Sequence, residues 1–390
     1  MNNNDKQIKY RQLGFEACYL AACALRNSVP APDPSVDMDE LYRFCKFHSI
    51  TSIVAMALEL VWKECPTDEA VMNRWRQSRD KAIRKNILLN AERERILSHL
   101  ESIGCWYMPL KGSLLQFDYP KFGMRQMSDN DLLVDPEKTA EIKRFMVANG
   151  YNSEQYLQGH HDEYNRKPVY NFEIHRSLFK TEEAPALAAY YANVHHRCQK
   201  DADNDFGYHM SRSDFFIYMM AHAYNHFQES GIGIRHLLDV FVFLGKYEQE
   251  LDRHYVDREL EKLGLYEFSH WSTRISRELF ERSQRSTSLQ AEDALLLDAF
   301  FSSGSHGTEE QLFRKSYEKF AASSGNSRFR YFLHRMFPSR KLLGVTYPIV
   351  KKHGWMVPFV WICRLIRSVF IRPDRVLRET RNLISDKNNG

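Results

Sequence analysis

The sequence predicts an α+β protein in which a small mixed sheet is flanked by helical regions on its N-terminal and C-terminal sides. Short apolar runs bounded by glycine or polar residues gather between 104 and 178, as is typical of strands. Before and after them, apolar residues recur at helical spacing, as in 68–100 and 214–246. We therefore predict four parts: an N-terminal helical region over 1–103, an α/β core over 104–180, a helical domain over 181–325 and a C-terminal helical tail over 326–390.

The composition is that of a globular protein with a sizeable core, because 43% of its 390 residues are hydrophobic and 27% are charged. The net charge of +4 is too small to predict nucleic-acid binding by itself. Seven scattered cysteines without a CxxC pair indicate reduced thiols in a cytoplasmic protein. No signal-peptide core is visible at the N-terminus, and no stretch reaches the roughly 18 apolar residues of a membrane span. We therefore expect a cytoplasmic protein without a transmembrane segment.

The N-terminal region is predicted to be helical apart from a turn at 30–34. Asp37 or Asp39 is expected to cap the second helix. A long charged helix follows, and its apolar positions are predicted to be Ile83, Ile87, Leu88, Ala91, Ile96, Leu97 and Leu100. The same helix carries a basic run from Arg74 to Lys85 that could meet RNA or a nucleotide. A solvated helix face is favoured instead, because the net charge is modest.

The core opens with a turn that suits phosphate. The apolar run 106–110 predicts a buried strand that breaks at Lys111-Gly112-Ser113. Gly112 permits a sharp turn and the close approach of a ligand. A helix that starts at Ser113 would present unpaired N–H groups to phosphate, with Lys111 and the Ser113 hydroxyl as further donors. Strand–glycine–helix turns are common, so this turn alone is a weak signal.

Three acids sharpen the prediction. Asp129 and Asp131 stand two apart at the start of an apolar strand, so they share one face with Cα atoms about 6.6 Å apart. Two carboxylates so placed repel each other, and they are suited to hold Mg²⁺ through oxygen ligands. The strand predicted over 169–175 puts Glu173 on its polar face, where it could meet the two aspartates across the sheet. A two-metal phosphoryl-transfer site needs such a third acid.

This combination resembles a known family. The pattern consists of Leu110-Lys111-Gly112, Arg125, Asp129-Asn130-Asp131-Leu132-Leu133-Val134 and Glu173-Ile174-His175. It resembles the bacterial "uncharacterised nucleotidyltransferase" family of the DNA polymerase beta-like nucleotidyltransferase superfamily. The resemblance implies a nucleotidyltransferase α/β core that binds a nucleoside triphosphate with Mg²⁺. It places Gly112 and Ser113 on the superfamily's Gly-Ser turn, although Lys111 replaces the usual first glycine and the gap from Ser113 to Asp129 is long.

The resulting hypothesis is an Mg²⁺-dependent nucleotidyltransferase that moves an NMP group from an NTP to an unidentified acceptor hydroxyl and releases pyrophosphate. Asp129, Asp131 and Glu173 are the expected catalytic residues and the ligands of two Mg²⁺ ions, with Glu173 as ligand or base. The expected nucleotide-binding residues, which would cradle the phosphates and neutralise their charge, are Lys111, Gly112, Ser113 and Arg125.

The helical domain supplies candidates for the acceptor side of the site. The resemblance implies that this domain packs over the active site, and the candidates are His175, His222, His226, Arg235 and Asp239. His222 and His226 share one helix face, but a Zn²⁺ site is disfavoured because no third ligand is evident. Arg235 and Asp239 are four apart, which favours a structural ion pair on one helix. His175 could touch phosphate, orient a carboxylate, contact the acceptor or be structural.

Three alternatives remain open for the function. The acceptor could be a protein side chain that receives AMP or UMP. It could be RNA, against which the modest charge argues. The chain could also be a non-catalytic nucleotide-binding or interaction module, against which the presence of all three acids argues. In the tail, 355–370 is predicted to be a helix docked on the body, and an interfacial membrane helix is disfavoured because Arg364 and Arg367 stand singly.

Overall fold

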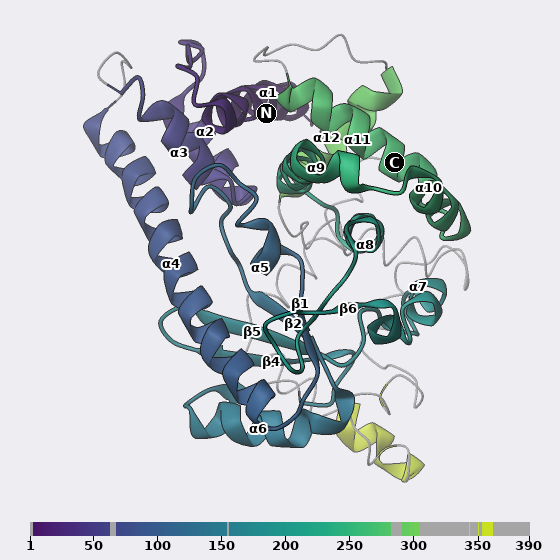
Figure 1. The fold of residues 1–390 in the computed structure, drawn as a ribbon. Coiled ribbons are helices and arrows are strands. Elements are labelled where there is room, and N and C mark those ends of the chain that lie inside the picture. Colours follow the sequence, from purple (N-terminus) through teal and green to yellow (C-terminus); the bar gives the residue numbers. More distant parts are fainter. Residues whose placement is uncertain are drawn as a thin grey trace. The chain divides into compact units, whose positions relative to one another are not determined.

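A five-stranded mixed sheet organises the first of two structural units, Met1–Gly307 (Figure 1). Its strands are β1 (Tyr107–Pro109), β2 (Asn130–Val134), β3 (Asn152–Ser153), β4 (His161–Arg166) and β5 (Tyr170–His175). Their spatial order is β1-β2-β5-β4-β3, with β5 parallel to β2 and the other neighbours antiparallel. The predicted α+β class with a small mixed sheet is therefore confirmed.

The structure is a computed structural model, and it describes residues 3–62, 68–153, 156–281, 291–304, 343, 350 and 353–361. The second unit, Thr308–Gly390, contributes the short helix η4 (Gly354–Met356), and its described apolar residues Leu343, Val350 and Val360 form a small cluster. Of the helix predicted over 355–370, only 355–361 lies within the described residues, where Trp355 and Phe359 are exposed. Among the described helices, none is long and apolar enough to span a membrane.

One face of the sheet is apolar and lies under two helices. These are α4 (Glu69–Ser102) and α6 (Thr139–Ala148), which follows the short turn η1 (Pro136–Lys138). Leu132, Val134 and Phe172 belong to this core together with residues of both helices. Alternation along the strands turns Asp131 and Leu133 to the opposite face, since successive side chains of a strand point to opposite sides. Asp131 and Glu173 therefore lie on the face away from α4.

The opposite face is covered by the helices that follow the sheet. Leu133 and Met108 share a core with α8 (Arg212–Glu229), α9 (Ile234–Tyr247) and α10 (Arg253–Lys262). The connecting segment contains α7 (Pro185–Tyr190), η2 (Val194–Arg197) and the hairpin β6 (Gln199–Lys200) and β7 (Tyr208–His209). The remaining elements of this part are the short helix η3 (Glu248–Glu250), α11 (Tyr266–Phe280) and α12 (Ala291–Ser303).

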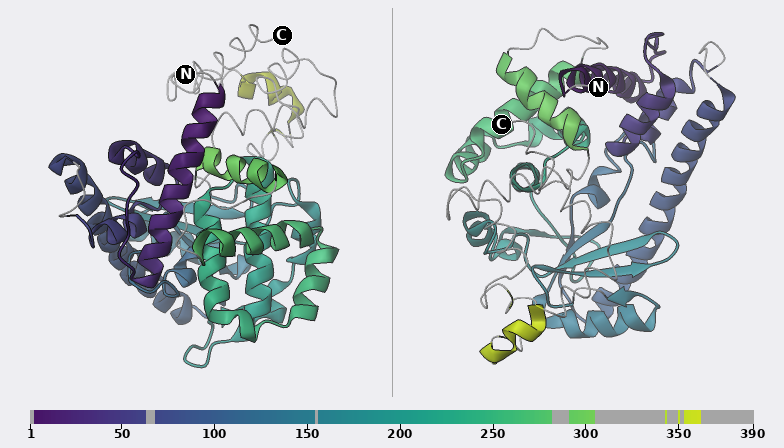
Figure 2. Two further views of the ribbon diagram at one scale, coloured as in Figure 1. Left: turned by 90° about the horizontal axis from the view of Figure 1, so that it is seen from above. Right: turned by 180° about the vertical axis from the view of Figure 1, so that it is seen from behind.

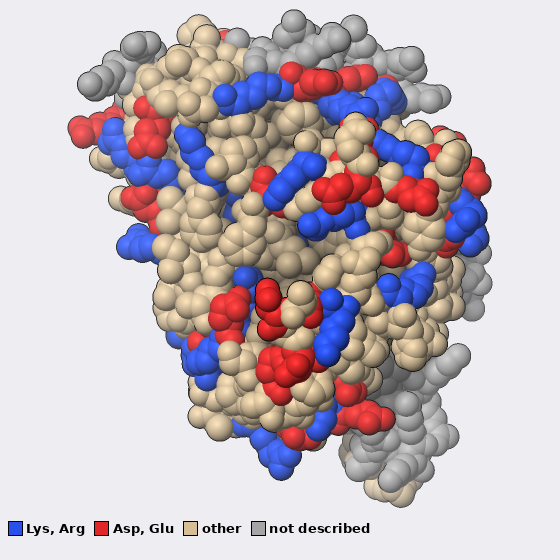
Figure 3. Space-filling view, viewed as in Figure 1, with Lys and Arg blue, Asp and Glu red and all other residues tan. Residues whose placement is uncertain are grey.

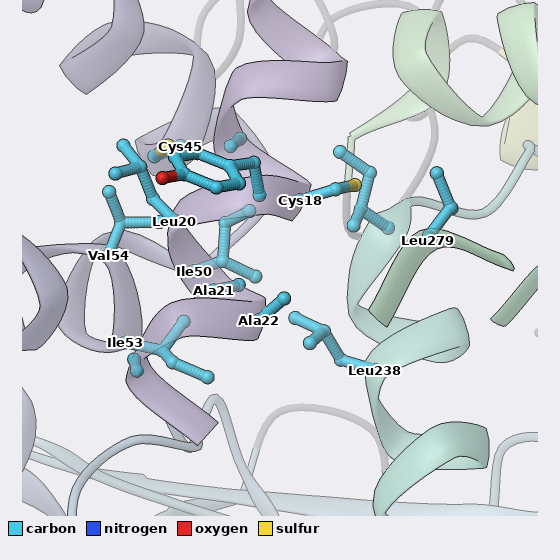
Figure 4. Packing of buried hydrophobic residues seen from close by; sticks show 14 of the residues in the cluster. Cys18, Leu20, Ala21, Ala22, Cys45, Ile50, Ile53, Val54, Leu238 and Leu279 are labelled. Carbon is cyan, nitrogen blue, oxygen red and sulfur yellow. The ribbon is translucent and has the colours of Figure 1, made fainter. Parts of the chain in front are cut away.

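The N-terminal helices join the helices of the C-terminal half in one core. These are α1 (Asn3–Arg26), α2 (Met38–Phe47) and α3 (Thr51–Leu58). α1 lies beside α3, α11 and α12 (Figure 2). In the core, Leu20 of α1 and Ile53 of α3 gather with Leu238 of α9 and Leu279 of α11 (Figure 4). This shared core ties the first and last parts of the unit to each other.

The N-terminal helices match part of the expectation. Asp37 caps α2 through the amides of Asp39 and Glu40, as predicted. The predicted apolar positions of α4 are wrong at Ile87, Leu88 and Ala91: the first two are 53% and 38% exposed, and Ala91 is exposed as well. The buried stripe of α4 instead follows Ala82, Asn86, Leu89, Arg93, Ile96 and Leu100. Because three polar residues, Asn86, Glu92 and Arg93, are buried on this helix, a search for apolar periodicity alone shifts the stripe by one position.

Candidate functional site

The sheet brings two of the predicted acids side by side. In the parallel pair of β2 and β5, Asp131 lies opposite Glu173, and Leu133 lies opposite His175. All four side chains belong to the face that α8 covers, by the alternation described above. Asp129 precedes β2 and reaches the same region from the loop. The proximity of Asp131 and Glu173 therefore follows directly from strand register.

A cavity of about 220 Å³ lies between this face and the helices α8 and α9. Ten of the twelve predicted site residues line it: Lys111, Gly112, Arg125, Asp129, Asp131, Glu173, His222, His226, Arg235 and Asp239. The two that do not are Ser113 and His175. The surface seen in Figure 3 is hollowed near its centre, and both acidic and basic side chains gather around the hollow.

Asp131 contacts a charged or hydrogen-bonding side chain through each of its two carboxylate oxygens. One carboxylate oxygen lies 3.3 Å from Lys111 Nζ, and the other lies 3.0 Å from His175 Nε2. Burial alone would raise the pKa of Asp131, but Lys111 and His175 outweigh it and hold that pKa well below its usual range. Asp131 is therefore ionised at neutral pH although it is only 5% exposed.

Asp129 has the opposite electrostatic character. Burial, followed by the nearby charge of Asp131, raises its pKa. The repulsion between the Asp129 and Asp131 carboxylates would be reduced by a cation bound between them. Asp131, Glu173 and His175 each offer one ligand atom, and these atoms lie within 4.8 Å of one another. Carboxylate oxygens are the ligands that Mg²⁺ prefers, so the residues present fit a divalent cation.

The turn at Lys111 differs from the expectation. The positive φ of 48° falls on Lys111 rather than on Gly112. Helix α5 spans only Gly112–Leu115, and the Ser113 hydroxyl donates to Leu110 O at 2.6 Å. Ser113 is buried and its donor is already used, which argues against the predicted contact of this hydroxyl with phosphate. The hydrogen bond of the Ser113 hydroxyl instead stabilises the turn that contains Lys111.

Gly112 has a specific neighbour, since a Cβ atom added there would lie 2.2 Å from Arg125 Nη1. The glycine thus admits the Arg125 guanidinium into the wall of the cavity. We expect Gly112→Ala to lower the free energy of unfolding by about 1–3 kcal/mol through overpacking, measured by urea denaturation.

The matched control for that variant is Gly245→Ala in α9, where an added Cβ meets nothing within 4 Å. A glycine-to-alanine change inside a helix is expected to stabilise by about 0.5–1 kcal/mol. Equal effects of the two substitutions would contradict the packing of Arg125 over Gly112.

Arg125 forms a buried ion pair with Asp239. Its Nε and Nη2 donate to the two Asp239 oxygens at 2.8 Å and 2.9 Å, and Tyr119 OH donates to Asp239 at 2.8 Å. The predicted pairing of Asp239 with Arg235 on one helix is therefore wrong, since Asp239 points to the loop before β2. The guanidinium expected to neutralise phosphate is already neutralised by this carboxylate.

Arg235 is left without a carboxylate partner within 4 Å in the described part of the chain. It donates to Ser128 Oγ at 3.2 Å and to Gln126 O at 3.5 Å. Burial, followed by the charge of Arg125, lowers its pKa from the ordinary arginine value, and the guanidinium remains a cation. A buried cation whose nearest negative charges, Asp239 and Asp129, form no ion pair with it attracts an anion. Arg235 is thus better placed for phosphate than Arg125.

Sequence reasoning missed three lining or supporting residues. Lys85 of α4 donates to Ser128 O at 2.8 Å, next to Asp129, and Ser128 and His236 line the cavity. The basic run on α4 was a signal for Lys85, but two other members, Arg74 and Arg79, form ion pairs with Asp39 and Glu59 instead. No sequence pattern pointed to His236, whose neighbours are set by tertiary packing.

The His222–His226 pair lies between two cavities. Their Nε2 atoms are 3.0 Å apart. Burial and the charge of Lys111 hold the pKa of His222 well below its usual range, so this imidazole is neutral. In the described ranges, no third His, Cys, Asp or Glu completes a metal site with this pair. His222 and His226 also line a second cavity of about 220 Å³, which shares Lys111 and Glu173 with the first.

Comparison with protein families adds one finding. A family model described as an uncharacterised nucleotidyltransferase matches residues 34–281, which is more than half of the chain. The matched range contains every candidate residue named above. No curated protein and no solved structure matches the chain.

Proposed function

The chain belongs to the uncharacterised nucleotidyltransferase family, and from that premise we propose the following reaction. The protein transfers a nucleotidyl group from a nucleoside triphosphate to an acceptor hydroxyl, requires Mg²⁺ and releases pyrophosphate. The observation that carries the proposal is the cavity in which Asp129, Asp131 and Glu173 face Lys111 and Arg235. Acids that bind cations and bases that bind phosphate meet there, as nucleotidyl transfer requires.

The three acids have distinct tasks in the proposal. Asp131 and Asp129 hold Mg²⁺ from β2 and the loop before it, and Glu173 adds a ligand from β5. Bound Mg²⁺ supplies charge neutralisation on the phosphates and lowers the pKa of the acceptor hydroxyl. His175 keeps Asp131 in place through its hydrogen bond, so it acts as a positioning residue.

Phosphate binding falls to the cations of the cavity wall. Arg235 meets the triphosphate because no carboxylate occupies it. Lys111, which neutralises Asp131 in the structure, lies beside the same phosphates. Arg125 holds Asp239 and shapes the turn at Gly112, so its contribution is to position rather than to bind.

Transfer then requires one proton movement. The acceptor hydroxyl gives its proton to the Glu173 carboxylate while its oxygen bonds to the α-phosphorus. The bond from the α-phosphorus to the bridging oxygen breaks, and pyrophosphate leaves with that electron pair. The pair of His222 and His226, of which burial keeps His222 neutral, lies at the junction of the two cavities, within reach of an acceptor that enters from the second one.

The test is nucleotide-dependent thermal stabilisation with ATP, GTP, CTP and UTP, each with and without Mg²⁺. A shift of the melting temperature that needs Mg²⁺ and favours one base is expected. Product analysis completes the test, because attack at the α-phosphorus releases pyrophosphate whereas attack at the γ-phosphorus leaves a nucleoside diphosphate. No Mg²⁺-dependent shift with any of the four nucleotides, or a diphosphate product, would sink the proposal.

Arg235→Gln should weaken nucleoside triphosphate binding about 10-fold or more, since a charge-assisted hydrogen bond contributes about 1.5–3 kcal/mol. The control is Arg84→Gln on the exposed side of α4, which should leave the dissociation constant unchanged. Calorimetric titration of both variants distinguishes them. An equal affinity of the two variants would move the phosphate site away from α9.

A further inference from the structure

Three histidines gather at the end of β4 and β5, outside the acid-lined cavity. This histidine cluster consists of His160, His161 and His175. His161 and His175 are cross-strand partners in the antiparallel pair of β4 and β5. The ring centroids are 4.5 Å apart for His160 and His161, 5.0 Å for His161 and His175, and 5.3 Å for His160 and His175. One ring nitrogen from each lies within 4.8 Å of the other two.

His161 and His175 each direct Nε2 at a carboxylate. His175 uses Nε2 for Asp131, and its Nδ1 is buried without a hydrogen-bond partner. His161 has Nε2 turned to the carboxylates of Glu163 and Glu173, at 3.6 Å and 3.9 Å. In metal sites, the non-ligating nitrogen of a histidine commonly meets a carboxylate in this way. His161 Nδ1 is directed at His160 Nε2, and His175 Nδ1 has no hydrogen-bond partner in the described part of the chain.

The distance between ring nitrogen atoms of His160 and His161 matches that of two ligands on one metal ion. His161 Nδ1 lies 3.4 Å from His160 Nε2. Two ligands at about 2.0–2.1 Å from a tetrahedral ion are about 3.3–3.4 Å apart.

The positions of the three ligands are held by the fold. Strand register holds His161 and His175, and the His160 carbonyl accepts from Arg176 N at 2.8 Å and Ser177 N at 3.3 Å. Their side chains line the second cavity of about 220 Å³, beside Phe179. A site built on strands needs little reorganisation to bind an ion. The cavity leaves room for a further, exchangeable ligand.

We propose that the histidine cluster binds a divalent transition-metal ion of the zinc class, through one nitrogen each of His160, His161 and His175. The fourth position opens into the second cavity. Three nitrogen ligands suit Zn²⁺ and exclude Mg²⁺, which takes oxygen ligands. The three histidines do not line the acid-lined cavity, although His175 is hydrogen-bonded to Asp131 of that cavity. The proposed site does not depend on whether the chain transfers nucleotides.

Zinc binding by the full-length, untagged chain tests the proposal. After removal of metal with a chelator, calorimetric titration is expected to show one tight Zn²⁺ site per chain. Co²⁺ should produce the visible absorption of a four-coordinate ion in the same site. His160→Ala and His161→Ala should each weaken Zn²⁺ binding by at least about 100-fold, since losing even an outer partner costs about 10–100-fold. His160→Gln and His161→Gln preserve more of the packing and should weaken binding as well.

Two control variants separate this site from its neighbours. His226→Ala removes the other histidine pair, and Asp129→Asn removes an acid of the first cavity; both should keep the tight Zn²⁺ site. Asp129→Asn should at the same time lose the Mg²⁺-dependent response to nucleotide. No tight Zn²⁺ binding by the wild type, or tight binding that survives in a folded His160/His161 double variant, would overturn the proposal.

Discussion

Asp129→Asn is expected to abolish Mg²⁺-dependent nucleotide binding and to lower transfer about 10²–10³-fold, while the protein stays as stable as the wild type or becomes more stable. The fall in rate follows from the loss of one cation ligand, at the scale on which single electrostatic groups act in catalysis. The stability follows from the pKa of Asp129, which burial and Asp131 raise.

The sign of the effect on stability can be worked out. A carboxyl whose pKa is raised by folding stabilises the native state fully only below the unfolded pKa, and this contribution is lost as pH rises through the folded pKa. Above the folded pKa, the charge of Asp129 therefore costs free energy, and Asn removes that cost. The pKa of Asp131 is lowered instead, so its charge stabilises the fold at neutral pH and is lost as pH falls.

Asp131→Asn is therefore the matched comparison for Asp129→Asn. Asp131→Asn should lower stability at pH 7, because it leaves Lys111 and His175 without their carboxylate. Urea denaturation of both variants with a chelator present, at pH 7 and near pH 4, measures whether each substitution raises or lowers the free energy of unfolding. Transfer at the wild-type rate in either variant, or the same sign of stability change in both, would contradict the assignment.

Arg125→Met is expected to lower the free energy of unfolding by about 3–5 kcal/mol, the largest effect on stability that we predict. Arg125 and Asp239 are 8% and 10% exposed in their side chains, and two hydrogen bonds join them. Removing the cation leaves a buried carboxylate whose remaining donor is Tyr119. Because Gly112 packs against the same guanidinium, we also expect weaker nucleotide binding.

A double-mutant cycle isolates this ion pair. Replacing both members, as Arg125→Met with Asp239→Leu, should cost clearly less than the sum of the single changes, since no charge is then left unpaired. The control is Arg43→Met, whose side chain is 71% exposed in its pair with Asp39 and which should cost about 0.5 kcal/mol or less. Additive single effects, or a loss for Arg125→Met no larger than the control, would refute the role of the pair.

Local patterns were sufficient to predict the sheet and the acids near it. The apolar runs around Leu132 and Ile174 predicted β2 and β5, because period-two alternation is a property of the strand itself. The spacing of Asp129 and Asp131, and the polar face that carries Glu173, follow from the same alternation. The acids were therefore predictable as neighbours once the two strands paired.

The ion-pair and hydrogen-bond partners of these polar side chains depended on the tertiary structure. Arg125 forms an ion pair with Asp239, which is 114 residues away in the sequence. The Ser113 hydroxyl donates to Leu110 O within its own turn. The histidine cluster joins His175 to two residues of the neighbouring strand region, and no local motif marks it. The sequence alone determined the elements and the face on which each polar side chain lies, because those follow from backbone periodicity. Only the tertiary structure decided the pairings, because contacts between distant segments depend on how helices and strands pack.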